Sequence, residues 1–248
     1  MNSAHFDQVA ADFHATEGYM DSGALGSWDA LLNFQDSMEI KGDLFEIGSF
    51  RGKSATIMAH HARPEENVIL VDSELEGNVM DETLARVDQI KPGTTIHVCR
   101  SDELTRRMDV DAAASSCRWI HIDGGHTMAA VINDLKVADT LLKHDGMICM
   151  DDFFAPQWPQ VTAAVFRFLY TSVTDLNLIL VGFNKGYLCR TSALKSYLRF
   201  IAEELSQALD ERATPNTMAK TDYDPFINCF GVSAKIGDFE VIGALDNY

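Results

Sequence analysis

Residues 44–55 read LFEIGSFRGKSA and carry the strongest structural signal in the sequence. The apolar residues up to Ile47 predict a buried strand, Gly48 and Gly52 predict a turn, and the residues that follow predict a helix start. Glycine lets the backbone come close to a ligand, and the free N–H groups of a helix N-terminus attract anionic groups. The segment therefore predicts a ligand-binding loop at the end of a strand.

Apolar runs and helical patterns alternate after this segment. Strands are expected at 43–48, 67–72, 94–99, 118–123, 146–151, 176–182 and 186–191, and helices between the first six at 53–62, 80–90, 102–108, 127–143 and 157–172. Near-continuous apolar runs are typical of parallel strands buried on both faces. Only residues 183–186 separate the last two strands, so these must form an antiparallel hairpin. We predict an α/β fold with a doubly wound, seven-stranded, mostly parallel sheet and a terminal antiparallel hairpin.

Three regions are expected along the chain. Residues 1–40 hold leading helices that pack on the core, residues 41–192 form the ligand-binding core, and residues 193–248 form a C-terminal helix and a tail. The tail leaves three alternatives open, namely a short hairpin, a segment that closes over the site, and an oligomer contact.

Composition restricts the class of partner. The chain has 248 residues, 46% of them hydrophobic, and a formal net charge of −17. Nucleic-acid binding needs clustered Lys and Arg, which are missing here, so a small-molecule partner is expected. No apolar run is long enough to span a membrane, and the N-terminus lacks signal-peptide features. We expect a cytoplasmic protein, without a membrane partner, that forms a homodimer.

The loop at 48–54, GSFRGKS, has two interpretations. It is similar to a phosphate-binding P-loop, which would make the protein a nucleoside triphosphatase. The P-loop, however, has four residues between its first glycine and the Gly-Lys-Ser triplet, and this chain has three. The P-loop interpretation stays open as the alternative.

The segment EIGSFRGKSA resembles motif I of the S-adenosylmethionine-dependent methyltransferases. Its form, E-x-G-x-x-x-G-x-S, is similar to that of the catechol-type O-methyltransferases and their bacterial relatives. The resemblance extends from about residue 42 to residue 152, and more loosely through the hairpin. It implies a class I, Rossmann-like methyltransferase fold with S-adenosylmethionine as cofactor. A non-catalytic protein of the same fold is a further alternative.

The resemblance implies roles for individual cofactor-binding residues. Glu46 would accept from the cofactor ammonium, Gly48 would allow close approach, and Ser54 would bind the cofactor carboxylate. Asp72 would accept from both ribose hydroxyls, since one carboxylate can take two donors.

A second group of implied cofactor contacts follows the third strand. Ser101 would lie beside the adenine, with Asp102 as the competing choice, although both residues also fit a helix cap. Asp134, in the following helical pattern, is expected at the surface.

Asp123, Asp151 and Asp152 follow the fourth and fifth strands. In the resembling metal-dependent O-methyltransferases, residues at these positions hold one Mg²⁺, a role that suits carboxylate oxygens. Asp123 would also border the cofactor. The alternative for Asp151 or Asp152 is a cap or a loop contact.

His126 lies where the catechol-type enzymes have a catalytic lysine and the macrolide-sugar enzymes a histidine. The resemblance implies Mg²⁺-assisted O-methylation of a small hydroxylated metabolite, with His126 as general base. His121, within a strand pattern, is expected to serve core packing alone. Aromatic residues after the fifth strand would line the acceptor site or pack the next helix (Phe153, Phe154 and Trp158).

Overall fold

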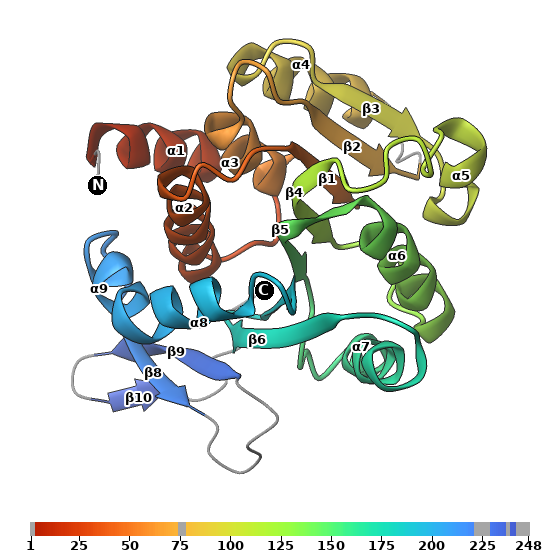
Figure 1. The fold of residues 1–248 in the computed structure, drawn as a ribbon. Coiled ribbons are helices and arrows are strands. Elements are labelled where there is room, and N and C mark those ends of the chain that lie inside the picture. The colour runs from red at the N-terminus through yellow and green to blue at the C-terminus, as the bar shows by residue number, and fades with distance from the viewer. Residues whose placement is uncertain (1–2, 74–77, 221–228, 237–238, 242–248) are drawn as a thin grey trace.

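The computed structural model describes residues 3–73, 78–220, 229–236 and 239–241. The helices are α1 (Ser3–Ala15), α2 (Ser22–Ser37), α3 (Lys53–His61), α4 (Val79–Ile90), α5 (Leu104–Arg107), α6 (Met128–Leu141), α7 (Pro159–Thr171), α8 (Leu194–Glu203) and α9 (Leu205–Asp210). The strands are β1 (Asp43–Ile47), β2 (Val68–Asp72), β3 (Thr95–Val98), β4 (Cys117–Ile122), β5 (Leu142–Met150), β6 (Leu176–Gly182), β7 (Lys185–Arg190), β8 (Asn216–Lys220), β9 (Phe230–Ile236) and β10 (Phe239–Val241). Figure 1 shows their arrangement.

One central sheet runs through the molecule. Its strands follow the order β10-β9-β6-β7-β5-β4-β1-β2-β3, and β8 pairs with β9. The pairs that join β5, β4, β1, β2 and β3 are all parallel, whereas β7 is antiparallel to both β5 and β6. The predicted α/β sheet with an antiparallel hairpin is therefore confirmed.

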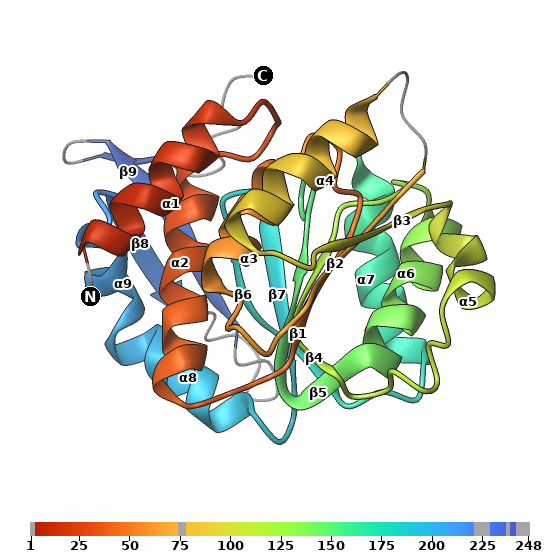
Figure 2. The same ribbon diagram turned by 90° about the horizontal axis from the view of Figure 1, so that it is seen from above.

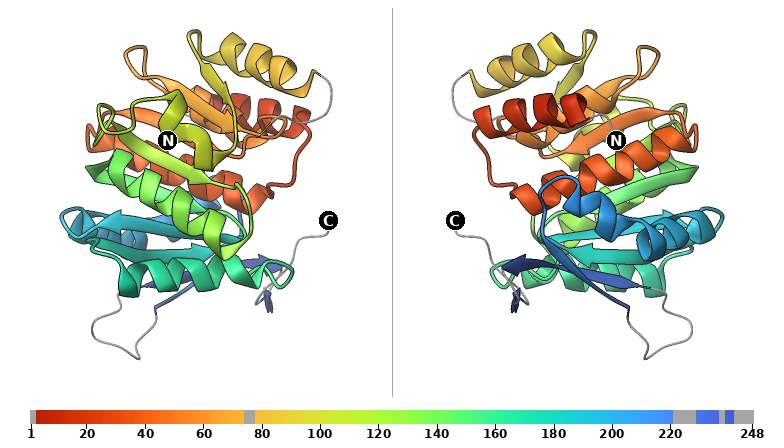
Figure 3. Two further views of the ribbon diagram at one scale, coloured as in Figure 1. Left: turned by 90° about the vertical axis from the view of Figure 1, so that its right-hand side faces the viewer. Right: turned by 90° about the vertical axis from the view of Figure 1, so that its left-hand side faces the viewer.

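The expected number of seven strands is wrong. Within the described residues the sheet has ten strands, because three strands from the tail extend it. Strand β9 pairs with the free edge of β6, and β8 and β10 flank it (Figure 3). An exposed sheet edge is an available row of hydrogen-bonding groups, and this tail covers it.

Helices cover both faces of the sheet. Helices α1–α4, α8 and α9 lie on one face, and α5–α7 lie on the other (Figure 2). Each layer has its own buried apolar cluster, with Trp28 and Trp119 in contact inside the first and Phe45 and Phe168 in the second. The sheet is thus apolar on both faces, as its strand sequences predict.

Two of these helices begin at side-chain caps. Asp21 accepts from the Ala24 backbone N–H at 2.7 Å, and Thr127 accepts from that of Ala130 at 3.3 Å. The C-terminal helix predicted within residues 193–248 is instead two helices, α8 and α9, which meet at Glu204.

Backbone hydrogen bonds fix the strand ends that matter for function. The N–H of Gly48 donates to Val71 (2.8 Å), and that of Asp123 donates to Ile47 (2.7 Å). The N–H of Asp151 donates to Ile122 at 2.9 Å. Strands β2, β1, β4 and β5 are neighbours, so the residues after their carboxyl ends meet at one edge of the sheet. Ligands bind at such an edge in open parallel sheets.

Candidate functional site

The loop after β1 lies against the end of β4. Gly48 has φ +88°, and a Cβ atom at this position would lie 1.8 Å from the backbone oxygen of Asp123. No side chain fits there, so Gly48 is required by the fold as well as by any ligand. Gly52, at φ +80°, precedes helix α3 and completes the turn.

Glu46 forms a buried polar group with Ser54 and His121. Its Oε1 atom accepts from the Ser54 hydroxyl at 2.5 Å and lies 2.7 Å from Nδ1 of His121. Its Oε2 atom is buried and has no hydrogen-bond partner among the described residues. A buried carboxylate oxygen of this kind needs a donor. The cofactor ammonium would supply one, whereas the predicted contact of Ser54 with the cofactor carboxylate stays a prediction.

Asp72 ends β2 beside the same loop. Its Oδ2 atom accepts from the Phe50 N–H at 2.7 Å, and the residue is 9% exposed. Burial raises the pKa of Asp72, and Glu46 raises it further, while backbone N–H groups of the loop oppose both effects. The carboxylate is therefore held at the strand end, where the ribose contact was predicted.

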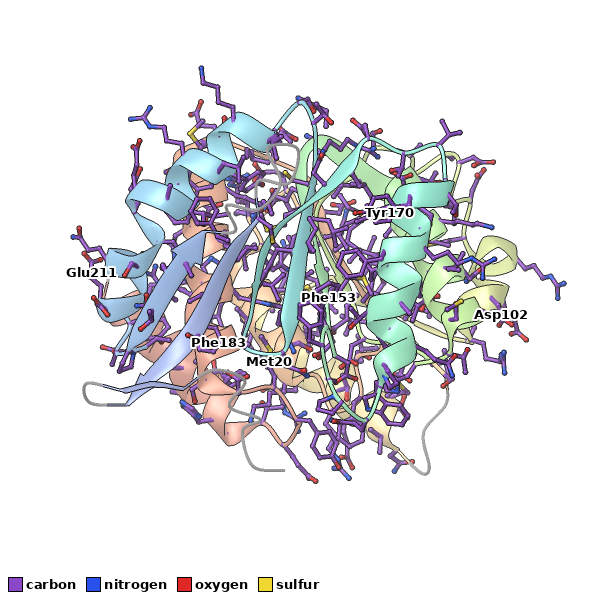
Figure 4. The ribbon with its side chains drawn as sticks, turned by 90° about the horizontal axis from the view of Figure 1, so that it is seen from below. Met20, Asp102, Phe153, Tyr170, Phe183 and Glu211 are labelled. Carbon is purple, nitrogen blue, oxygen red and sulfur yellow. The ribbon has the colours of Figure 1, made fainter. Side chains whose placement is uncertain are left out.

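Ser101, Asp102 and Asp134 lie beyond β3. Ser101 begins a 3₁₀ turn and lies near Asp134. Asp102 pairs with Arg100 at 2.9 Å on the outer side of the molecule, near α5 (Figure 4). Because this carboxylate is paired and exposed, the geometry favours Ser101 over Asp102 as the cofactor contact.

The expectation that Asp134 is a surface residue is wrong. The side chain is fully buried, and a Cβ atom at Gly124 would lie 2.7 Å from its Oδ2 atom. Burial raises the pKa of Asp134 to about 6, although hydrogen bonds from Ser101 and Asn133 lower it. Helix α6 therefore presents this face to the sheet and not to solvent.

Asp151 is paired with a buried lysine that the sequence did not point to. Its Oδ1 atom lies 2.5 Å from Nζ of Lys185 and also accepts from the backbone N–H of Asp152 (2.6 Å). The side-chain amide of Asn184 lies 3.3 Å away from the same oxygen. Burial alone would raise the pKa of Asp151, but Lys185 and His121 hold it well below its usual range.

His126 lies between Asp123 and Asp152. Its Nε2 atom is 2.9 Å from Oδ2 of Asp152 and 3.8 Å from Oδ1 of Asp123. The nearby carboxylate of Asp123 raises the pKa of His126, burial lowers it, and Asp152 adds to the rise. The surrounding protein and the charge of Asp151 raise the pKa of Asp123 to about 7, although its side chain is 37% exposed.

Two groups of side chains that share Asp123 could each hold a divalent cation. Potential ligand atoms of Asp123, His126 and Asp152 lie within 4.8 Å of one another, as do those of His121, Asp123 and Asp151. Carboxylate oxygens are the ligands that Mg²⁺ prefers. Asp123 and Asp152 would hold the ion directly, and Asp151 would reach it through Oδ2.

Aromatic side chains border this group. The ring of Trp158 stacks on His126 with centroids 4.3 Å apart, and Trp158 is 42% exposed. Phe154 is 60% exposed, but Phe153 is buried against Gly186. Of the three aromatic residues proposed from the sequence, Phe154 and Trp158 face outward and Phe153 packs the core.

Sequence reasoning missed two members of the site. His121 was assigned to core packing alone, but it lies between Glu46 and Asp151, 3.8 Å from Oδ2 of the latter. Burial alone would lower the pKa of His121, and its two carboxylate neighbours raise it to about 9. Lys185 was placed in the hairpin loop, and a lysine next to a loop gives no signal of burial.

Residues 45–153 match the profile of a family described as a methyltransferase domain. These residues are similar to a methyltransferase domain. The match covers the strand-end residues of the site from Glu46 to Asp152. It favours the methyltransferase interpretation over the P-loop alternative, in agreement with the three-residue spacing in the loop.

Solved methyltransferase structures share the fold. The apo structure of CalS11, a TDP-rhamnose 3′-O-methyltransferase of calicheamicin biosynthesis, matches with a TM-score of 0.55 and 16% identity over 66% of this chain and 77% of that one. TomG, an O-methyltransferase from Streptomyces achromogenes in complex with S-adenosylmethionine, matches with a TM-score of 0.51 and 17% identity over 64% of this chain and 77% of that one. An O-methyltransferase from Bacillus cereus in complex with S-adenosylhomocysteine matches with a TM-score of 0.56 and 11% identity over 75% of this chain and 89% of that one. No curated protein sequence matches the chain.

The described helices add one observation on membranes. None of them has both the length and the apolar character that a membrane crossing requires.

Proposed function

We propose that this chain is an S-adenosylmethionine-dependent O-methyltransferase that acts on a small hydroxylated molecule, assisted by Mg²⁺, with His126 as general base. The observation that carries the proposal is the meeting of two groups at one edge of the central sheet. One is the loop at Gly48 with Asp72. The other is His126 among the carboxylates.

The cofactor side of the proposal is supported by two carboxylates beside the loop after β1. The free Oε2 atom of Glu46 would accept from the methionine ammonium, and Asp72 would accept from the ribose. The cofactor can come close to the backbone at Gly48 because this residue has no Cβ. Ser101 would contact the adenine.

The acceptor side rests on the surroundings of His126. When bound, the cofactor supplies a methyl group on a sulfonium, and the cation supplies positive charge beside the acceptor oxygen. Nε2 of His126 faces Asp123 and Asp152, so an acceptor hydroxyl held at these carboxylates presents its proton to that nitrogen. Trp158 fixes the imidazole plane by stacking. Positioning of the acceptor beside the methyl group then accounts for much of the rate.

Calorimetry tests the cofactor first. The metal-stripped protein is titrated with S-adenosylmethionine and with ATP, each with and without Mg²⁺. We expect binding of S-adenosylmethionine and none of ATP. Binding of ATP alone would refute the methyltransferase proposal and restore the P-loop interpretation.

Turnover is tested by release of S-adenosylhomocysteine with a panel of phenols, catechols and hydroxylated sugars. We expect turnover with at least one acceptor, and its loss after chelation with EDTA. An Asp151→Ala variant should lose the dependence on metal and most turnover, while it keeps cofactor binding. Activity that EDTA leaves untouched would refute the role of Mg²⁺, and cofactor binding without turnover on any acceptor would indicate a non-catalytic protein.

A further inference from the structure

Lys185 is a buried cation in direct contact with Asp151, one of the carboxylates assigned to the metal. It is 2% exposed, and its Nζ atom lies 2.5 Å from Oδ1 of Asp151. It begins β7, directly after the turn residues Phe183 and Asn184, which both have positive φ. A buried ammonium is costly unless it is paired, so its pairing with Asp151 stabilises the folded chain.

The two carboxylate oxygens of Asp151 have different contacts. Oδ1 is surrounded by three donors, the ammonium of Lys185, the N–H of Asp152 and the amide of Asn184. Oδ2 has one described polar neighbour, Nε2 of His121, at 3.8 Å. A carboxylate oxygen with three donors has little capacity left for a cation. Asp151 therefore presents a single oxygen, Oδ2, to an ion at the site.

The net charge of the group also bears on how strongly an ion binds. Asp123, Asp151 and Asp152 are three carboxylates, and among the described residues Lys185 is the one buried ammonium that contacts one of them, Asp151. When the three carboxylates are ionised and His126 is neutral, three negative charges and one positive charge leave a formal charge of −2. The Glu46–His121 pair adds nothing to this sum when both are ionised. One divalent cation would neutralise the group.

We propose that Lys185 is a positioning residue that weakens the metal site: it occupies Oδ1 of Asp151 and reduces the negative charge that the ion meets. The inference deepens the proposed function and rests on its metal site. Loss of the ammonium would free Oδ1 of Asp151 as a ligand and make the formal charge of the group more negative, from −2 to −3. Because opposite charges attract more strongly in a partly dry site, the ion would then bind more tightly.

The test is Mn²⁺ binding alone, measured by electron paramagnetic resonance of the free ion, without cofactor or acceptor. The Lys185→Met variant removes the charge and the donor, and Lys185→Gln removes the charge but keeps a donor for Oδ1. We expect both variants to bind Mn²⁺ at least about tenfold more tightly than the wild type, Lys185→Met the more so. The matched control is Lys195→Met, an exposed lysine on α8, which should leave the affinity unchanged.

A purely structural role for Lys185 would make any variant bind the ion equally or less well. Unchanged or weaker Mn²⁺ binding by folded Lys185→Met and Lys185→Gln, with folding checked by thermal unfolding, would overturn the inference. If Lys185→Met fails to fold, Lys185→Gln carries the test alone. Absence of Mn²⁺ binding in the wild type and the variants would refute the metal site itself, while S-adenosylmethionine binding would still test the remaining function.

Discussion

Oδ2 of Asp152 lies 2.9 Å from Nε2 of His126, the nitrogen that also faces Asp123. Asp152 has φ +54°, a left-handed conformation, and Asn184 donates to its other oxygen at 2.9 Å. Such a conformation is unfavourable for a residue with a Cβ and persists where surrounding contacts enforce it. The loop after β5 is thus built to hold one carboxylate against this imidazole.

Replacement of His126 tests its role as base. We expect His126→Gln to lower kcat by about 100-fold to 10,000-fold, the range for loss of a general base. The affinity for S-adenosylmethionine should stay within the error of calorimetry, because His126 has no contact with Glu46 or Asp72 among the described residues. His144→Gln is the matched control, since that side chain is 76% exposed. Equal loss of activity in both variants, or none in His126→Gln, would argue against the assignment.

The ribose assignment is tested at Asp72. Removal of the carboxylate in Asp72→Ala deletes two acceptor contacts and should weaken cofactor binding by about 10-fold to 100-fold. Mn²⁺ binding should be unchanged, because Asp72 belongs to neither group of possible metal ligands. Calorimetry with S-adenosylmethionine and resonance measurements with Mn²⁺ give the two readouts. An unaltered cofactor affinity would disprove the ribose contact.

Gly48 and Gly93 form a matched pair for testing the loop. Both have positive φ, +88° and +89°, but an added Cβ meets the Asp123 backbone at Gly48 and nothing within 4 Å at Gly93. Gly93→Ala should therefore lower the free energy of unfolding by about 1 kcal/mol, the cost of the left-handed conformation. Gly48→Ala should cost more than about 3 kcal/mol, because backbone must also move. Urea unfolding measures both, and equal losses would show that the close approach at Gly48 is not maintained.

The sequence predicted the parts of the site that follow from strand order. Gly48, Asp72, Asp123 and Asp151 each come directly after, or end, an apolar run. Parallel neighbouring strands bring such residues together whatever the side chains between them are. The same reasoning predicted the α/β sheet and its antiparallel hairpin.

Other parts depend on register and turn geometry, which a single sequence does not determine. Glu46 and His121 are paired across β1 and β4, and a shift of one residue would separate them. The hairpin turn uses two residues, so Lys185 pairs with Gly182 inside the sheet and is not in a loop. A short hairpin was one of three alternatives for the tail, and the sequence did not decide among them because the pairing of the tail depends on the free edge of β6, far away in sequence.

The buried carboxylate of Asp134 predicts a pH-dependent stability. Its pKa is raised from 3.8 to about 6 in the folded state, so its favourable contribution is present below pH 3.8 and is lost as the pH rises through about 6. At about pH 8 the ionised group should cost about 3 kcal/mol, and Asp134→Asn should recover part of it.

The measurement is urea unfolding of the wild type and Asp134→Asn at several pH values between about 4 and about 8. The advantage of the variant should grow up to about pH 6 and then level off. Asp111→Asn, which alters an exposed carboxylate, should show no such growth. An advantage of Asp134→Asn that is constant across the range would mean that Asp134 does not change its protonation on unfolding. A variant less stable at every pH would mean that the hydrogen bonds of the carboxylate outweigh the cost of burying its charge.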